Sequence, residues 1–179
     1  MYKKSLAFIL FILAIFNCNA TYQISSITTR DGLSQSEVNN IMQDSYGYVW
    51  LSTTDGLNRT DGVTTTVMRL TPKNRELTQI YGAIKEDNYK KLWISIAGDV
   101  LIYNLSSEKT DLLSDMLPNL PKFDNNNRII MQMGNNDNVW LSDEYQLIEL
   151  SNAKGKPTFK SSVKKMVIEL GIFLLTNEI

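Results

Sequence analysis

The sequence of 179 residues contains no histidine, and cysteine occurs once, at Cys18. The missing histidine excludes Ser-His-Asp and Cys-His catalysis, histidine metal sites and the residue that most often transfers protons near neutral pH. A single cysteine excludes an intrachain disulfide and a cysteine-based zinc site. These absences disfavour most enzyme classes. We therefore expect no catalytic residues, no metal and no cofactor, and a fold that rests on packing.

Basic residues show neither an excess nor a cluster. Lys and Arg number 18 against 19 Asp and Glu, and no run of five or more basic residues occurs. The electrostatic pattern of a nucleic-acid-binding protein is thus missing, and we expect no contact with nucleic acid. Hydrophobic residues make up 43% of the chain and charged residues 21%, which is typical of a globular protein.

The first 20 residues have the order of a secretory signal peptide. Lys3 and Lys4 precede an apolar run from Leu6 to Phe16, and the segment closes on Cys18-Asn19-Ala20. We predict cleavage after Ala20 and export of residues 21–179. Two alternatives stay open, namely an uncleaved membrane anchor and lipidation at Cys18.

The three tryptophans reveal an internal repeat. Trp50, Trp93 and Trp140 are spaced by 43 and 47 residues, and their surroundings align without gaps. The positions directly before, directly after and nine residues before each tryptophan are apolar in all three units: Val49, Leu92, Val139, Leu51, Ile94, Leu141, Ile41, Ile84 and Met131. A period of this length is typical of propeller blades.

Each unit holds about four short β-prone runs separated by turn residues. The sequence predicts an all-β fold, a partial β-propeller of three four-stranded blades at about residues 30–70, 74–115 and 121–162. Residues 163–179 are expected to begin a fourth blade, with one strand from Val163 to Glu169 and another from Ile172 to Thr176.

Asp44 and Gly47 are expected to form the hairpin turn before Trp50. The three tryptophans are expected to pack between blades, with sugar stacking as the alternative. A cation site made of Asp44, Asp55 and Asp61 is a weaker alternative, because unit two keeps only Asp87 and unit three has Gly134 at that position.

Residues 32–62 strongly resemble the two-component regulator propeller repeat. In this sequence Thr60 stands at a position where the family has tyrosine, Ser52 replaces a usual glycine, and unit three keeps little beyond Trp140. The positions that match the family pattern are Gly32, Leu33, Ser34, Gln43, Asp44, Gly47, Trp50, Thr53, Gly56, Leu57, Arg59, Asp61 and Gly62.

The resemblance implies the N-terminal fragment of a hybrid two-component histidine kinase of Bacteroidetes type. Such sensors are periplasmic, are anchored in the inner membrane by other segments, and are thought to detect oligosaccharides and regulate polysaccharide use. We therefore expect a non-enzymatic sensing module with an oligosaccharide ligand, whose missing blades come from a longer chain or a partner chain. The ligand contacts stay unassigned, and the kinase activity would lie outside this chain.

Two other functions remain open at this stage. One is a truncated remnant without independent activity. The other is a carbohydrate-active propeller enzyme, with carboxylates that follow the strands as candidates: Asp55, Asp61, Asp99 and Asp143.

Overall fold

The computed structural model describes residues 24–74, 77, 80, 82–125, 128–164, 167–169 and 172–174. The predicted signal peptide, residues 1–20, lies outside the described residues. Three four-stranded antiparallel sheets make up most of the structure, and each is a meander in which consecutive strands pair. This confirms the predicted fold class, an all-β partial propeller with three four-stranded blades.

The first sheet contains β1 (Val38–Gln43), β2 (Val49–Thr53), β3 (Gly56–Thr60) and β4 (Thr65–Met68). The second contains β5 (Ile84–Glu86), β6 (Lys91–Ile96), β7 (Asp99–Asn104) and β8 (Thr110–Leu112). The third contains β9 (Ile130–Met133), β10 (Asn138–Ser142), β11 (Gln146–Ser151) and β12 (Thr158–Lys164). Short helical turns occur in the connections: η1 (Thr29–Asp31), η2 (Pro72–Asn74), α2 (Leu113–Met116) and η3 (Ala153–Gly155).

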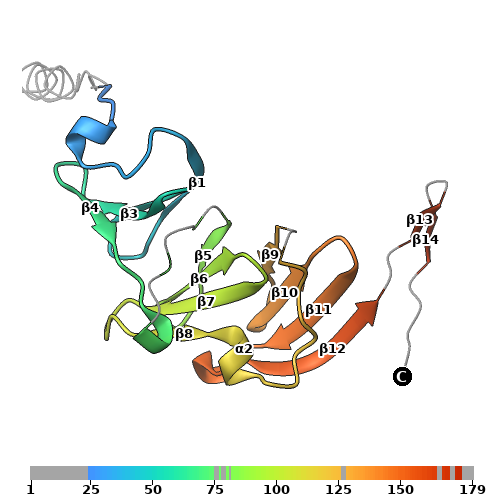
Figure 1. Ribbon diagram of the computed structural model, residues 1–179. Helices are drawn as coiled ribbons and strands as arrows, with labels where there is room; N and C mark the ends of the chain where they lie inside the picture. Colours follow the sequence, from blue (N-terminus) through green and yellow to red (C-terminus); the bar gives the residue numbers. More distant parts are fainter. Residues whose placement is uncertain are drawn as a thin grey trace, which may run out of the picture.

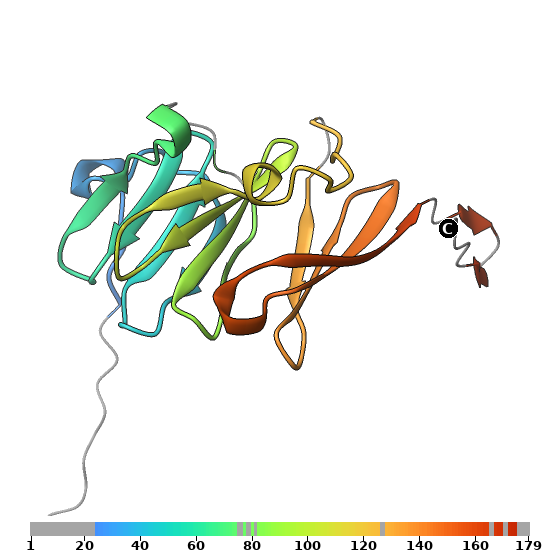
Figure 2. The ribbon, with the colours of Figure 1, turned by 90° about the horizontal axis from the view of Figure 1, so that it is seen from below.

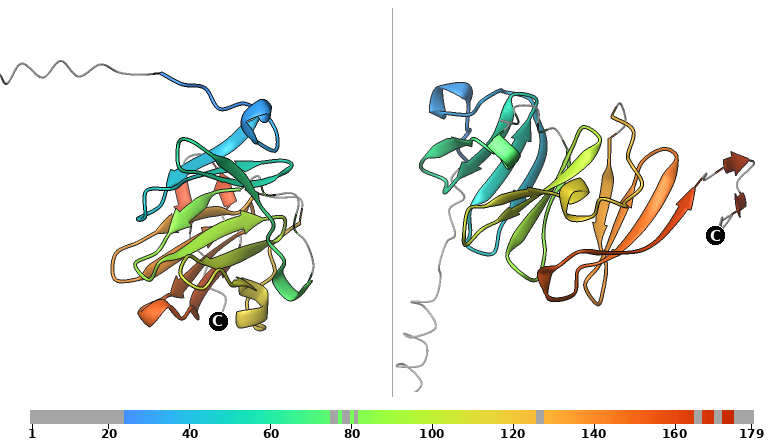
Figure 3. Two further views of the ribbon diagram at one scale, coloured as in Figure 1. Left: turned by 90° about the vertical axis from the view of Figure 1, so that its left-hand side faces the viewer. Right: turned by 60° about the horizontal axis from the view of Figure 1, so that its bottom comes forward.

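The sheets stack face to face in chain order, as Figure 1 shows from blue through yellow-green to orange. The views in Figure 2 and Figure 3 show the same succession, with the second sheet between the other two. Stacked sheets bury the side chains of their facing surfaces, so the two central strands of the second sheet, β6 and β7, are buried on both faces. Its β6 shows this directly, with Leu92 to Ile96 all buried.

Two hydrophobic clusters hold the stack together. The cluster between the first and second sheets contains Trp50, Leu57, Leu70, Ile80, Ile84, Leu92, Ile94, Ile96, Leu101 and Tyr103. The cluster between the second and third sheets contains Trp93, Val100, Ile102, Leu113, Phe123, Ile129, Met131, Val139, Leu141, Ile148 and Leu150. In both clusters, residues from the connections between sheets fill the space beside the strands.

The end of the third sheet differs from the sequence prediction. Val163 does not begin a fourth blade, because it pairs with Leu147 and extends β12 of the third sheet to Lys164. A separate hairpin follows, formed by β13 (Val167–Glu169) and β14 (Ile172–Leu174). The expected single strand from Val163 to Glu169 is therefore divided between two sheets.

Candidate functional site

Asp44 connects the first hairpin turn to the tryptophan of the next strand. Its Oδ1 atom accepts hydrogen bonds from the backbone N–H groups of Tyr46 at 2.9 Å and Tyr48 at 3.0 Å. Its Oδ2 atom accepts a bond of 2.7 Å from the indole Nε1 of Trp50. Gly47 completes this turn at a φ of 93°, in the left-handed region that glycine adopts without steric cost.

Asp87 repeats this arrangement in the second sheet. Oδ1 accepts from the backbone N–H groups of Tyr89 and Lys91, at 2.8 and 2.9 Å, and Oδ2 accepts from the indole of Trp93 at 3.0 Å. Lys90 stands in the place of Gly47 and takes a φ of 61°. In the third sheet the corresponding position is Gly134, which has no carboxylate to offer Trp140. Sequence reasoning assigned Asp44 to the turn but missed its bond to Trp50.

The remaining motif residues of the first sheet make local contacts. The Thr53 hydroxyl donates to the Gly56 carbonyl at 3.0 Å, and Leu57 is fully buried. Asp61 accepts from the backbone N–H groups of Thr64 at 2.7 Å and Val63 at 2.9 Å, and these bonds lower the pKa of its carboxyl group. Gly62 follows at a φ of 90°.

The carboxylates considered for catalysis lie in turns or, like Asp99, at the first strand position after one. Asp99 accepts from the Val100 backbone at 2.8 Å and from the Ser114 hydroxyl at 2.5 Å. Asp143 accepts from the backbone N–H groups of Tyr145 and Gln146, both at 2.9 Å. Within the described residues, no group of three or more Asp, Glu, Cys or His side chains is arranged to hold a metal ion.

A cavity of about 440 Å³ lies beside the β6–β7 turn of the second sheet. Asp99 and Asn125 provide its polar side chains. Glycine at position 98 leaves room for the Asn125 side chain beside this turn, because a Cβ atom at Gly98 would lie 1.9 Å from the Asn125 Oδ1 atom. The residues that line the cavity come from four segments: Pro72, Leu77, Ile96, Ala97, Gly98, Asp99, Leu112 and Asn125.

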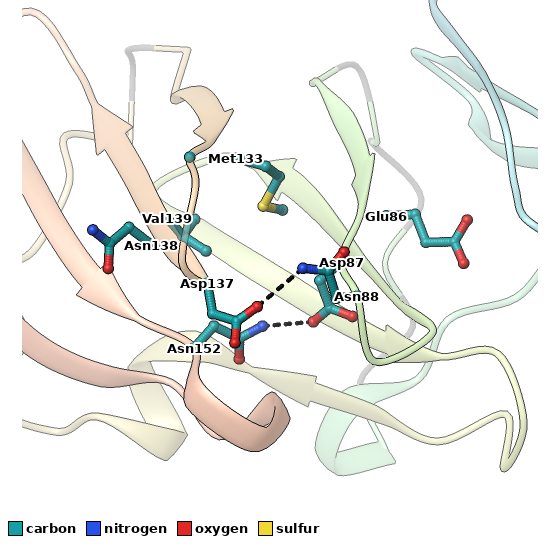
Figure 4. Close-up of a pocket in the computed structure, with 9 residues that line it drawn as sticks. Glu86, Asp87, Asn88, Met133, Asp137, Asn138, Val139 and Asn152 are labelled. Atoms are coloured by element: carbon teal, nitrogen blue, oxygen red, sulfur yellow. Dashed lines mark hydrogen bonds between the residues drawn. The ribbon is translucent and has the colours of Figure 1, made fainter.

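A second, smaller cavity of about 80 Å³ lies between the β5–β6 and β9–β10 turns, as Figure 4 shows. Two hydrogen bonds cross it, from Asn88 Nδ2 to Asp137 at 3.0 Å and from Asn152 Nδ2 to Asp87 at 2.7 Å. Its volume suits a few water molecules, because each takes about 30 Å³ in the liquid. The cavity and its hydrogen bonds therefore form a polar contact between the second and third sheets.

Tyr89 adds two hydrogen bonds to this polar contact between the sheets. Its hydroxyl donates to Asp137 Oδ2 at 2.7 Å and accepts from the Lys154 backbone at 2.9 Å. The first of these bonds raises the pKa of the Tyr89 hydroxyl and lowers the pKa of the Asp137 carboxyl group, to which Asn88 also donates. Gly155 packs directly on the Tyr89 ring, since a Cβ atom there would lie 2.9 Å from it.

No helix among the described residues is both long and apolar enough to cross a membrane.

Comparisons with known proteins support the family resemblance. Residues 32–55 match the family model described as two component regulator propeller. A 56-residue stretch is 45% identical to histidine kinase P4 of Formosa agariphila, covering 31% of this chain and 4% of that kinase.

Solved structures show the fold. The extracellular domain described as belonging to the hybrid two component system BT3049 of B. thetaiotaomicron matches with a TM-score of 0.61 and 20% identity, over 78% of this chain and 20% of that one. The corresponding domain of BT4673 matches with a TM-score of 0.60 and 21% identity, over 79% of this chain and 19% of that one. The chain thus spans about a fifth of these relatives. It carries a two-component regulator propeller repeat in its first sheet, within a partial propeller that has the fold of these extracellular domains.

Proposed function

We propose that this chain is a periplasmic ligand-sensing propeller module of the hybrid two-component type, and that its ligand is an oligosaccharide. The observation that carries the proposal is the family repeat at residues 32–55, which lies in a stack of sheets with the fold of extracellular domains of such systems. On this proposal the segment recognises the ligand and performs no chemistry. The kinase reaction belongs to other parts of the signalling system.

The cavity beside the β6–β7 turn is the ligand site that we assign. Its volume of about 440 Å³ lies within the range of small-molecule sites, about 300 to 1,000 Å³. Leu77, Ile96 and Leu112 offer apolar contact, while Asp99 and Asn125 offer hydrogen-bonding groups beside it. Such a mixture suits a sugar ring, which presents C–H groups on its faces and hydroxyl groups around its edge.

Calorimetric titration of the full chain with a panel of oligosaccharides tests this function. We expect heat of binding with one class of glycan, and loss of that heat in Asn125→Ala. The matched control is Asn135→Ala, an exposed asparagine outside this cavity. Absence of binding to every glycan would favour a remnant without activity, whereas release of shortened glycan products would favour the enzyme hypothesis. Binding that survives Asn125→Ala would place the ligand elsewhere.

A further inference from the structure

The small cavity between the second and third sheets contains a buried oxygen atom to which none of the described residues donates a hydrogen bond. Asn152 lines this cavity and is only 2% exposed. Its Nδ2 group donates to Asp87 Oδ2 at 2.7 Å, and this bond fixes the orientation of the amide. Its Oδ1 atom is buried without a partner among the described residues. Buried polar atoms are normally bonded, so this oxygen needs an electropositive partner within the cavity.

Half-buried carboxylates add negative charge to the same cavity. Glu86, Asp87 and Asp137 line it, and its lining in the described part of the chain includes no lysine or arginine. Lys90 lies 3.8 Å from Glu86, but neither Asp87 nor Asp137 forms a salt bridge with a described residue. Figure 4 shows the side chains of Asp87, Asp137 and Asn152 pointing toward one another. Charges removed from water are generally paired or coordinate metals, so the chemistry of this cavity favours a cation.

Asp137 has capacity left to bind a cation, whereas Asp87 has none. A carboxylate offers about four lone-pair positions. Asp87 uses all of them, in bonds from two backbone N–H groups, the Trp93 indole and the Asn152 amide. Asp137 accepts from two side chains, which leaves half of its positions open. The backbone N–H of Asn152 donates to the Asp137 carbonyl at 2.7 Å, so the open carboxylate positions and the free amide oxygen belong to adjacent residues.

We propose that this cavity binds a calcium ion, held by the Asp137 carboxylate, the Asn152 Oδ1 atom and water. Calcium takes about six to eight oxygen ligands, and carboxylates, asparagine carbonyls and water are all suitable. The ion therefore needs no cluster of three acidic side chains. Asp87 does not contact it, but orients Asn152 and adds negative charge.

The size of the cavity and its few protein ligands set the expected affinity. The volume of about 80 Å³ has room for an ion with a few water molecules. Because most of the ligands are water, the Kd should be about 0.1 to 1 mM, as in weak extracellular calcium sites. The site shares no lining residue with the cavity assigned to the glycan, so it does not depend on the proposed function.

Terbium luminescence tests the site in the full chain, because terbium(III) binds the same oxygen ligands as calcium and is excited through nearby aromatic rings. The Tyr89 hydroxyl donates to Asp137 at 2.7 Å and the Trp93 indole to Asp87 at 3.0 Å, so both rings lie beside the cavity. Terbium chloride should give saturable emission. Calcium chloride at millimolar concentration should reverse it, and magnesium chloride should do so less well, because Mg²⁺ demands octahedral geometry and gives up its water reluctantly. Sodium chloride at equal ionic strength should leave the emission unchanged.

Two substitutions with opposite effects locate the ion. Asp137→Asn should raise the Kd for terbium and calcium by about tenfold or more, because it removes the charged ligand. Asn152→Asp should lower the Kd by about tenfold, because it places a carboxylate oxygen where the free amide oxygen lies. Asp111→Asn, at an exposed position outside the cavity, is the matched control and should leave the Kd unchanged.

Circular dichroism of each variant establishes that it is folded before the titration. A gain of affinity in Asn152→Asp has no explanation in local unfolding, which can only weaken binding. Emission that does not saturate would show that the cavity holds water alone and would overturn the proposal. An unchanged Kd in Asp137→Asn, a raised Kd in Asn152→Asp, or stronger displacement by magnesium than by calcium would overturn it as well.

Discussion

The Oδ2 atom of Asp44 accepts a hydrogen bond from the indole Nε1 of Trp50, six residues further along the chain, and the two atoms lie 2.7 Å apart. The other carboxylate oxygen holds the backbone of the intervening turn. One buried side chain thus fixes both the reversal of the hairpin and the orientation of the largest side chain between the first two sheets.

Asp44→Ala should lower the free energy of unfolding by about 2 to 3 kcal/mol. The substitution leaves the buried Trp50 indole N–H without its charged acceptor, and bonds to charged groups contribute about 1.5 to 3 kcal/mol. Urea unfolding monitored by tryptophan fluorescence measures the loss. Asp55→Ala, at an exposed turn position, is the control and should change stability by no more than about 0.5 kcal/mol. Equal effects of the two substitutions would contradict this role of Asp44.

Gly134→Asp should stabilise the third sheet by about 1 kcal/mol. A Cβ atom at Gly134 would lie 3.3 Å from Trp140 Nε1, so the new carboxylate would reach the indole as Asp44 and Asp87 do in their sheets. Thermal unfolding measures the gain. Gly62→Asp provides the contrast, because its φ of 90° strains any other residue and should cost about 1 to 2 kcal/mol. A loss of stability in Gly134→Asp would show that the turn before Trp140 does not bring a carboxylate to the indole as the turns before Trp50 and Trp93 do.

Gly155→Ala should destabilise the chain more than Gly47→Ala does. Both glycines have positive φ, at 67° and 93°, so both substitutions introduce backbone strain of about 1 to 2 kcal/mol. Only the methyl group at position 155 would meet a neighbour, the Tyr89 ring at 2.9 Å, whereas nothing lies within 4 Å at position 47. Urea unfolding of both variants isolates the packing contribution as their difference. If they unfold alike, the Gly155–Tyr89 contact contributes nothing.

Asp137 should make stability depend on acid pH. Its pKa is lowered in the folded state, so its contribution is present above the unfolded value of about 3.9 and is lost as the pH falls through the folded pKa. Asp137→Asn should therefore lower stability at neutral pH, with a difference from wild type that narrows on acidification. Urea unfolding between neutral and acid pH measures this, and Asp111→Asn on the exposed edge of the second sheet is the control. A constant difference at all pH values would contradict the assignment.

The alignment of the three sequence units predicted the sheets well, because it depends on the local alternation of apolar residues and on turn residues. Trp50 and Trp93 lie between sheets at the expected positions, while Trp140 is only partly buried because no further sheet packs on it within the described residues. The connections were beyond sequence reasoning. Leu70, Ile80, Phe123 and Ile129 enter the clusters from segments without periodicity, so no pattern marks them as core.

A pattern in the sequence could have predicted the hydrogen bond between Asp44 and Trp50. Aspartate stands six residues before tryptophan in units one and two, and glycine replaces it in unit three. A constant spacing across a turn indicates that the two side chains can meet on one face of the hairpin. The cavity beside the β6–β7 turn had no such signal, because Pro72, Ile96 and Asn125 meet only through the packing of three separate segments.

The two hydrophobic clusters do not merge, and the second sheet contributes to both. The packing of each sheet therefore depends only on its immediate neighbours, and the second sheet is the one that packs on both of the others. Its amide protons, above all those of β6 and β7, should exchange with solvent more slowly than those of the outer sheets. Either outer sheet can then unfold locally while the second sheet stays folded, and the second sheet unfolds only after both outer sheets have done so.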